Sequence, residues 1–211
     1  MFSRNEKMRL FLLCACLLTV IALPVAAQPP TSESDLPVVV SFKGAYSDVA
    51  VKEMEREAGD ILRSSGVVLD WRTRNEAGAS DFKDLVLMTF RGSCMFTPLP
   101  PRYDELGPYA ITHTTSGDVL PFGEVDCDHV AGSARNAMSG GDYSKADVLV
   151  GRALGRVVAH ELVHMLTKSR AHGKEGVEKA ALTGRQLIAD QLPLSAFDID
   201  RLQAERRNAA R

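Results

Sequence analysis

The strongest constraint on how this chain folds is one long and unusually apolar helical pattern between residues 144 and 168. Its apolar side chains recur at helical spacing; they are Val148, Leu149, Leu154, Val157, Val158, Leu162, Met165 and Leu166. A helix that is apolar over so much of its surface has to be buried. Gly151, Gly155 and Ala159 lie four residues apart on one face, where glycine costs helix propensity. We therefore expect close backbone packing there, against a sheet.

The residues before this helix predict strands joined by a crossover helix. Apolar, β-branched runs at 38–42, 67–71 and 85–90 predict three strands. Between the first two runs, apolar residues recur at helical spacing; Ser47 can cap this helix and Gly66 can end it. A helix that joins two neighbouring strands favours a parallel crossover.

The segment between the third strand and the long helix carries weaker signals. Residues 109–112 predict a short strand, and residues 119–130 predict a strand at the edge of the sheet. Residues 131–143 are rich in glycine, serine and alanine and predict a flexible connection. Ser144 and Asp147 predict a capping box at the start of the long helix. The pattern as a whole predicts an α+β fold with a mixed sheet, a crossover helix and one long helix.

The first residues have the composition of a secretory signal peptide. Three basic residues are followed by an apolar run and by a small-residue cleavage site at 25–27. The apolar run is too short to span a bilayer comfortably. We expect residues 1–27 to be the signal peptide, residues 28–35 a flexible leader and residues 36–211 a single domain. The mature protein is then secreted or periplasmic, without stable membrane insertion.

Charge and cysteine content narrow the partners and the compartment. A net charge of −2 gives no electrostatic case for binding to nucleic acid or to an anionic membrane. Once the signal peptide is removed, Cys94 and Cys127 are the remaining cysteines. An even pair in an exported protein predicts a disulfide. The alternatives are two separate buried thiols or metal ligation, which the lack of a nearby second cysteine disfavours.

The chemistry is concentrated at the end of the long helix, in the sequence HELVH at 160–164. His160 and His164 are four residues apart, so both imidazoles project from one helical face and can reach one cation. Zinc binds imidazole nitrogen readily, and a catalytic zinc keeps one position open for water. Glu161 can accept a proton from a water molecule beside the metal. The motif therefore predicts a zinc site with Glu161 as general base.

A catalytic zinc normally has three protein ligands, and His172 is the preferred candidate for the third. It lies just past the expected helix end, beside Gly173, where the chain can turn back toward the metal. Glu175 and Glu178 remain alternatives. A structural role without metal is the competing interpretation, but unpartnered imidazoles and a carboxylate in an apolar helix would be costly to bury.

The HELVH motif on a long helix resembles the active site of the zincin metallopeptidases, and the order of elements before it is similar to theirs. The nearest resemblance is to uncharacterised secreted bacterial zincin-like proteins with an HExxH-x7-H pattern, over most of residues 36–190. It implies that His160, His164 and His172 bind Zn²⁺ and that Glu161 is the catalytic acid–base. In contrast to metzincins, the spacer before the third histidine lacks glycine, and no methionine follows it.

Together these features predict a secreted zinc-dependent hydrolase, most simply a metallopeptidase that acts on a peptide or protein substrate. An extended peptide would pair with an edge strand near residues 122–125. A residue that stabilises the oxyanion is expected, but the sequence does not identify it; Tyr143 and Arg170 are only close to the motif in sequence. His113 and His129 show no partner pattern and are expected on the surface or in loops. The alternative function is a catalytically inactive zinc-binding interaction module.

Overall fold

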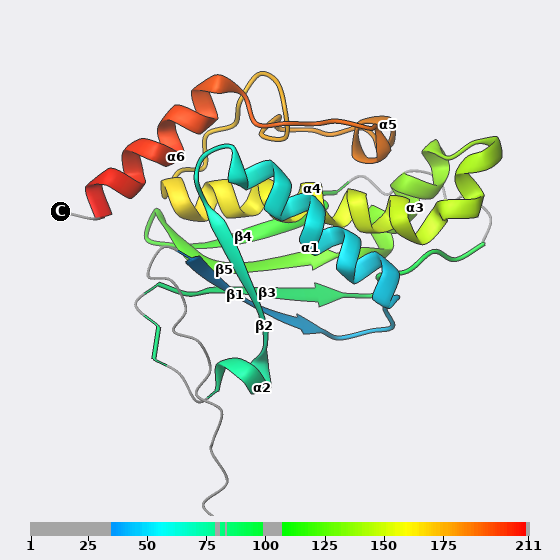
Figure 1. Ribbon diagram of the computed structural model, residues 1–211, viewed down its shortest axis with the longest axis horizontal. Helices are drawn as coiled ribbons and strands as arrows, with labels where there is room; N and C mark the ends of the chain where they lie inside the picture. Colours follow the sequence, from blue (N-terminus) through cyan, green and yellow to red (C-terminus); the bar gives the residue numbers. More distant parts are fainter. Residues whose placement is uncertain (1–34, 79–80, 83, 99–106, 210–211) are drawn as a thin grey trace, which may run out of the picture. The chain divides into compact units, whose positions relative to one another are not determined.

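A five-stranded mixed sheet carries the helices of this protein (Figure 1). The computed structural model describes residues 35–78, 81–82, 84–98 and 107–209. The predicted signal peptide, and the predicted leader up to residue 34, lie outside these residues. Asp35, assigned to the leader, instead begins the first strand. The strands are β1 (Asp35–Phe42), β2 (Val68–Thr73), β3 (Val86–Arg91), β4 (Ala110–Thr115) and β5 (Asp118–Asp126).

The strands have the order β2-β1-β3-β5-β4. Neighbouring strands are parallel, except for β4, which runs antiparallel to β5. The helices are α1 (Asp48–Arg63), α2 (Arg74–Ala77), α3 (Cys127–Ala137), α4 (Ala146–Thr167), α5 (Gly184–Ile188) and α6 (Ala196–Ala209), with a 3-10 helix, η1 (Gly140–Lys145). The predicted α+β class with a mixed sheet is confirmed. Among the described helices, none is both long enough and apolar enough to cross a membrane.

The predicted crossover unit is confirmed at both ends of its helix. The side chain of Ser47 accepts a hydrogen bond from the amide of Ala50 at the start of α1. At the other end Gly66 has a φ of 80°, a left-handed conformation that favours glycine. The amide of Val67 donates to the carbonyl of Leu62, which completes a Schellman-type end. The helix then leads into β2, which pairs parallel to β1 as predicted.

The predictions for residues 119–143 are partly wrong. Strand β5 lies between β3 and β4, so the edge on this side of the sheet is β4 rather than the segment around residues 122–125. The expected strand ends at Asp126, whose side chain accepts from the amide of His129 and caps α3. The helix α3 follows where a flexible connection was expected. One of its faces is buried, through Val130, Ala131 and Ala134.

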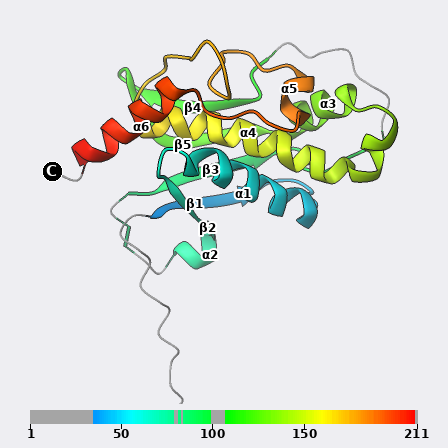
Figure 2. The same cartoon turned by 45° about the horizontal axis from the view of Figure 1, so that its top comes forward.

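The long helix is confirmed, but its glycine face packs on a helix rather than on the sheet. Figures 1 and 2 show α1 and α4 side by side over one face of the sheet. A Cβ at Gly155 would lie 2.7 Å from the Cβ of Glu57 and 2.7 Å from the carbonyl oxygen of Met54. The predicted capping box is also absent, because Asp147 accepts instead from the backbone amide of Phe96.

The close contact between α1 and α4 predicts that Gly155→Ala destabilises the protein. The added methyl group overpacks the contact, at a cost of about 1–3 kcal/mol, against a gain of about 1 kcal/mol in helix propensity. Gly59 of α1 is the matched control, because a Cβ there meets no atom within 4 Å. Urea unfolding should show Gly59→Ala at or above wild-type stability and Gly155→Ala below it. Equal gains from both substitutions would contradict the tight packing.

The predicted disulfide between Cys94 and Cys127 is present, with Cα atoms 4.8 Å apart. It connects the loop after β3 to the first residue of α3. The two cysteines are separated by 33 residues, and closing a loop of that length stabilises a fold by about 3–4 kcal/mol in the chain-entropy model. A disulfide is compatible with the oxidising compartment expected for an exported protein.

A buried arginine attaches the C-terminal segment to the two packed helices. Arg156 of α4 is fully buried and donates to Oε1 of Glu57 on α1 at 2.8 Å. The same guanidinium donates to the carbonyl oxygens of Gln186 and Ala189, at the end of α5. These bonds satisfy a cation that would be costly to bury alone. They also hold the residues after α4 against that helix.

Candidate metal centre

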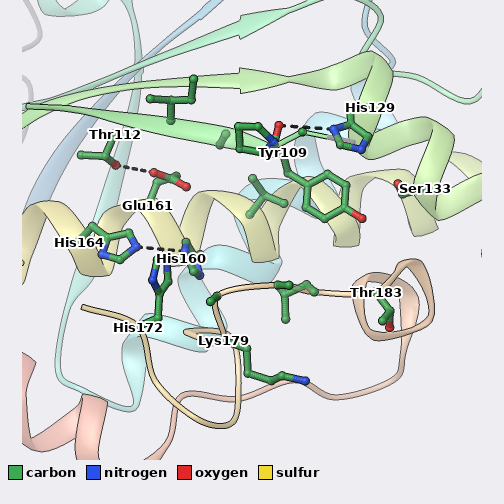
Figure 3. A pocket seen from close by; sticks show the side chains of 18 of the residues that line it. Tyr109, Thr112, His129, Ser133, His160, Glu161, His164, His172, Lys179 and Thr183 are labelled. Atoms are coloured by element: carbon green, nitrogen blue, oxygen red, sulfur yellow. Dashed lines mark hydrogen bonds between the residues drawn. The ribbon is translucent and has the colours of Figure 1, made fainter. Parts of the chain in front are cut away.

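Three histidines from two segments meet beside the end of α4 (Figure 3). His160 and His164 lie one turn apart on the helix, as their spacing predicts. The helix ends at Thr167, and Lys168 takes a left-handed conformation with a φ of 47°. This turn reverses the chain so that His172 returns to the helix. One ring nitrogen from each histidine lies within 4.8 Å of the other two, so the three can hold a metal ion.

Hydrogen bonds to the backbone orient the two helical imidazoles. Nδ1 of His160 is 2.9 Å from the carbonyl oxygen of Val177, and Nδ1 of His164 is 2.7 Å from that of Ser169. Because a carbonyl can only accept, each neutral ring carries its proton on Nδ1 and leaves Nε2 with a free lone pair.

The two free nitrogens face each other at a distance that suits a metal. Nε2 of His160 and Nε2 of His164 are 3.1 Å apart. Two nitrogens on a tetrahedral zinc, each about 2.0–2.1 Å from the metal, lie about 3.3–3.4 Å apart. Two lone pairs at this separation repel each other unless a cation lies between them. The spacing of these two nitrogens is therefore close to that of two ligands on one zinc ion.

The surroundings also favour the neutral form of these two imidazoles, which is the form that can bind a metal. Burial lowers the pKa of His160 and of His164 below the usual histidine value. Repulsion from the neighbouring imidazoles lowers both pKa values further. Because only the neutral ring can bind a metal, the lowered pKa values favour binding at neutral pH.

Glu161 faces the edge strand instead of joining the three nitrogens. Its Oε2 accepts a hydrogen bond of 2.5 Å from the hydroxyl of Thr112 on β4. Burial raises the pKa of Glu161, while the hydrogen bond from Thr112 and the nearby His164 and His172 oppose this shift. No sequence pattern pointed to Thr112; its role depends on β4 being the strand next to α4.

The two carboxylates considered as alternative third ligands lie outside the three-histidine cluster. Glu175 is exposed on the loop after His172. Glu178 is fully buried, and its Oε1 is 3.5 Å from Nδ1 of His160, the nitrogen that faces away from His164. Burial, together with the nearby Asp198, raises the pKa of Glu178 to about 9, so this side chain is neutral at pH 7. The structure thus brings together the preferred set of histidines.

A cavity of about 930 Å³ opens beside the three histidines. Its walls are formed by β4 and the residues just before it, by α3, and by residues 179–185, while α4 contributes the floor (Figure 3). This volume is within the usual range for ligand sites. Arg170 lines the cavity, whereas Tyr143 does not and packs its ring against Phe96.

The two remaining histidines have different surroundings. His113 is exposed on β4, as expected, with Nε2 3.5 Å from Oε1 of Glu124. The expectation for His129 is met only in part, because it lies on α3 and not in a loop, is half-buried and lines the cavity. Its ring centroid is 4.5 Å from that of Tyr109, so the two rings form one wall of the cavity.

Comparison with known proteins does not assign this chain to a family. No protein-family model matches the sequence, and no curated protein gives a significant match. The function therefore has to be inferred from the geometry of the site itself.

Proposed function

We propose that this chain is a secreted zinc-dependent peptidase of the zincin type, in which His160, His164 and His172 bind the metal and Glu161 is the general base. The observation that carries the proposal is the convergence of three ring nitrogens, with a carboxylate beside them in an open cavity. An HExxH helix that packs next to the edge strand of a mixed sheet supports the comparison with zincins.

The donor set favours zinc among the common metals. Three neutral imidazoles and a free coordination position are typical of catalytic zinc, whereas magnesium and calcium prefer oxygen ligands. When bound, zinc polarises the substrate carbonyl and makes water a stronger acid. The carbonyls of Val177 and Ser169 would keep two of the ligand rings oriented during the reaction.

In this proposal Glu161 transfers the proton. It takes a proton from the attacking water and returns it to the amine nitrogen that leaves when the peptide bond breaks. Thr112 occupies Oε2 of the carboxylate, which leaves Oε1 for the transfer. The raised pKa of the buried Glu161 suits a group that must both accept and release a proton near neutral pH.

The edge strand supplies a means of holding the substrate. Among the described strands, β4 pairs only with β5, along one side. The cavity is lined by Tyr109, which precedes β4, and by Ala110, Ile111, Thr112 and Thr114 of the strand. An extended peptide could add to the free edge through backbone hydrogen bonds. We therefore move the proposed substrate edge from residues 122–125 to β4.

We expect Thr112→Val to lower kcat by about 10- to 100-fold, because the hydroxyl positions the carboxylate and a hydrogen bond to a charged group is worth about 1.5–3 kcal/mol. The bond from Thr112 lowers the pKa of Glu161, so removing it moves the acidic limb of the pH–rate profile to higher pH. Thr112→Ser keeps the hydroxyl and should restore both values. An unchanged profile in the valine variant would remove Thr112 from the site.

The function is tested with the exported protein, loaded with zinc and incubated with a peptide library that is read by mass spectrometry. We expect cleavage that is lost on treatment with a chelator and restored by zinc. Fully zinc-loaded protein that cleaves no peptide would instead favour the inactive zinc-binding module. Protein that binds no zinc after reconstitution would contradict both functions.

A further inference from the structure

The cavity beside the histidines is basic, although the chain as a whole has a net charge of −2. Arg170, Lys179 and Arg185 line it, and the only carboxylate among its described lining residues is that of Glu161. That carboxylate already accepts a hydrogen bond from Thr112. A bound divalent cation would add further positive charge. The site therefore has the opposite charge to the molecule that carries it, which favours an anionic partner.

These three basic side chains have no ion-pair partner within the described ranges of the chain. Some other basic residues there are paired, as Arg152 is with Glu53 and Asp190, and others, such as Lys52 and Lys168, are not. Arg170 and Arg185 are exposed, whereas Lys179 is half-buried in the cavity wall. A partly buried cation without a counter-charge is a candidate contact for a ligand anion.

Lys179 is fixed relative to the metal ligands by its own backbone segment. The carbonyl of Val177, two residues earlier, accepts from His160, and the amide of Gly173 donates to the carbonyl of Glu178 at 2.8 Å. Lys179 itself forms an isolated bridge with Gly173, next to His172. Figure 3 shows the Lys179 side chain extending from this segment toward Thr183. Lys179 is one of the residues that line the cavity on this side.

We infer that the cavity selects peptides that carry a carboxylate on the α5 side of the metal, with Lys179 as the residue that binds it. This inference rests on the proposed peptidase function, because that function identifies the ligand as a peptide. The carboxylate could belong to an aspartate or glutamate side chain or to the C-terminus of the peptide. Both sources offer the same group to an ammonium ion, and the test below distinguishes them.

The test measures binding separately from cleavage. The zinc-loaded Glu161→Gln variant is titrated with fluorescent peptides of one length, at fixed ionic strength. One series has Glu, Gln or Lys at each position in turn, with an amidated C-terminus; a second has Gln throughout, with a free or amidated C-terminus. We expect at least one carboxylate peptide to bind about tenfold more tightly than its neutral counterpart. The series that shows the preference identifies the source.

Charge reversal then assigns the preference to Lys179. Lys179→Glu should abolish the preference for the carboxylate. Lys52→Glu is the matched control: it changes the net charge equally but lies exposed on α1, outside the cavity. Equal affinity for carboxylate and neutral peptides, a preference that survives in Lys179→Glu, or no peptide binding at all would overturn the inference. If the wild type cleaved peptides but showed no preference for a carboxylate, the inference about Lys179 would fail and the peptidase function would stand. If the protein bound carboxylate peptides selectively but cleaved none, the peptidase function would fail and the binding preference would stand.

Discussion

Replacing Glu161 by glutamine should leave zinc bound and abolish hydrolysis. The carboxylate is not among the three converging donors, so the metal keeps its ligands. Glutamine has nearly the same shape and can still accept from the hydroxyl of Thr112, so the local structure should survive. It cannot take a proton at neutral pH. Loss of a general base typically costs about 10²–10⁴-fold in rate, which would be measured as kcat on a cleaved peptide.

Glu175→Gln is the matched control for this experiment. It makes the same chemical change at an exposed position outside the three-histidine cluster, and we expect wild-type turnover. Zinc content is measured for both variants. If Glu161→Gln turned over at the wild-type rate with zinc bound, another group would be the base. If it lost its zinc, Glu161 would have to be reassigned as a ligand.

Replacing His172 by alanine should weaken zinc binding by at least about 100-fold. Loss of a residue that only supports a zinc ligand already costs about 10–100-fold in affinity, and His172 is proposed as a ligand itself. We expect about one zinc per wild-type chain, and a much weaker affinity in competition with a chelator of known strength for the variant. The helix should remain folded, because His172 is exposed and lies beyond its end.

His113→Ala serves as the control, since this exposed histidine lies outside the cavity. If His172→Ala held zinc as tightly as the wild type, the third ligand would be Glu175 or Glu178. For Glu178 that outcome would require a rearrangement, because it contacts Nδ1 of His160 and not the face shared with His164. Adding Glu178→Gln to the histidine variant would then decide between the two carboxylates.

Local patterns in the sequence determined the helices α1 and α4 and the pairing of His160 with His164 on one helical face. The spacing of His160 and His164 places both rings on one face of any α-helix, whatever that helix packs against. The cap at Ser47 and the glycine at Gly66 define the first crossover helix through bonds to their own neighbours. The cysteine pair was predictable for a different reason, because an exported chain with two remaining cysteines has one possible pairing.

Only the tertiary structure decided which segments meet. The edge position of β4 depends on the order of strands across the sheet, and the contact between Thr112 and Glu161 follows from it. The glycine face of α4 could have packed on strands or on a helix, since either allows close backbone approach. Lys179 came to line the cavity because its backbone pairs beside His172.

The choice of His172 over the downstream carboxylates has the same origin. Sequence spacing alone does not decide whether His172 or a glutamate a few residues later is the third candidate ligand. The left-handed turn at Lys168 brings His172 back to the helix, and the bond from His160 to Val177 places Glu178 beside Nδ1 of His160, the nitrogen that faces away from His164. Helical periodicity relates residues within one or two turns, so it was enough to place His160 and His164 on one face. The cavity, its basic lining and the bond from Thr112 to Glu161 come from contacts between residues far apart in the chain, which only the folded backbone brings together.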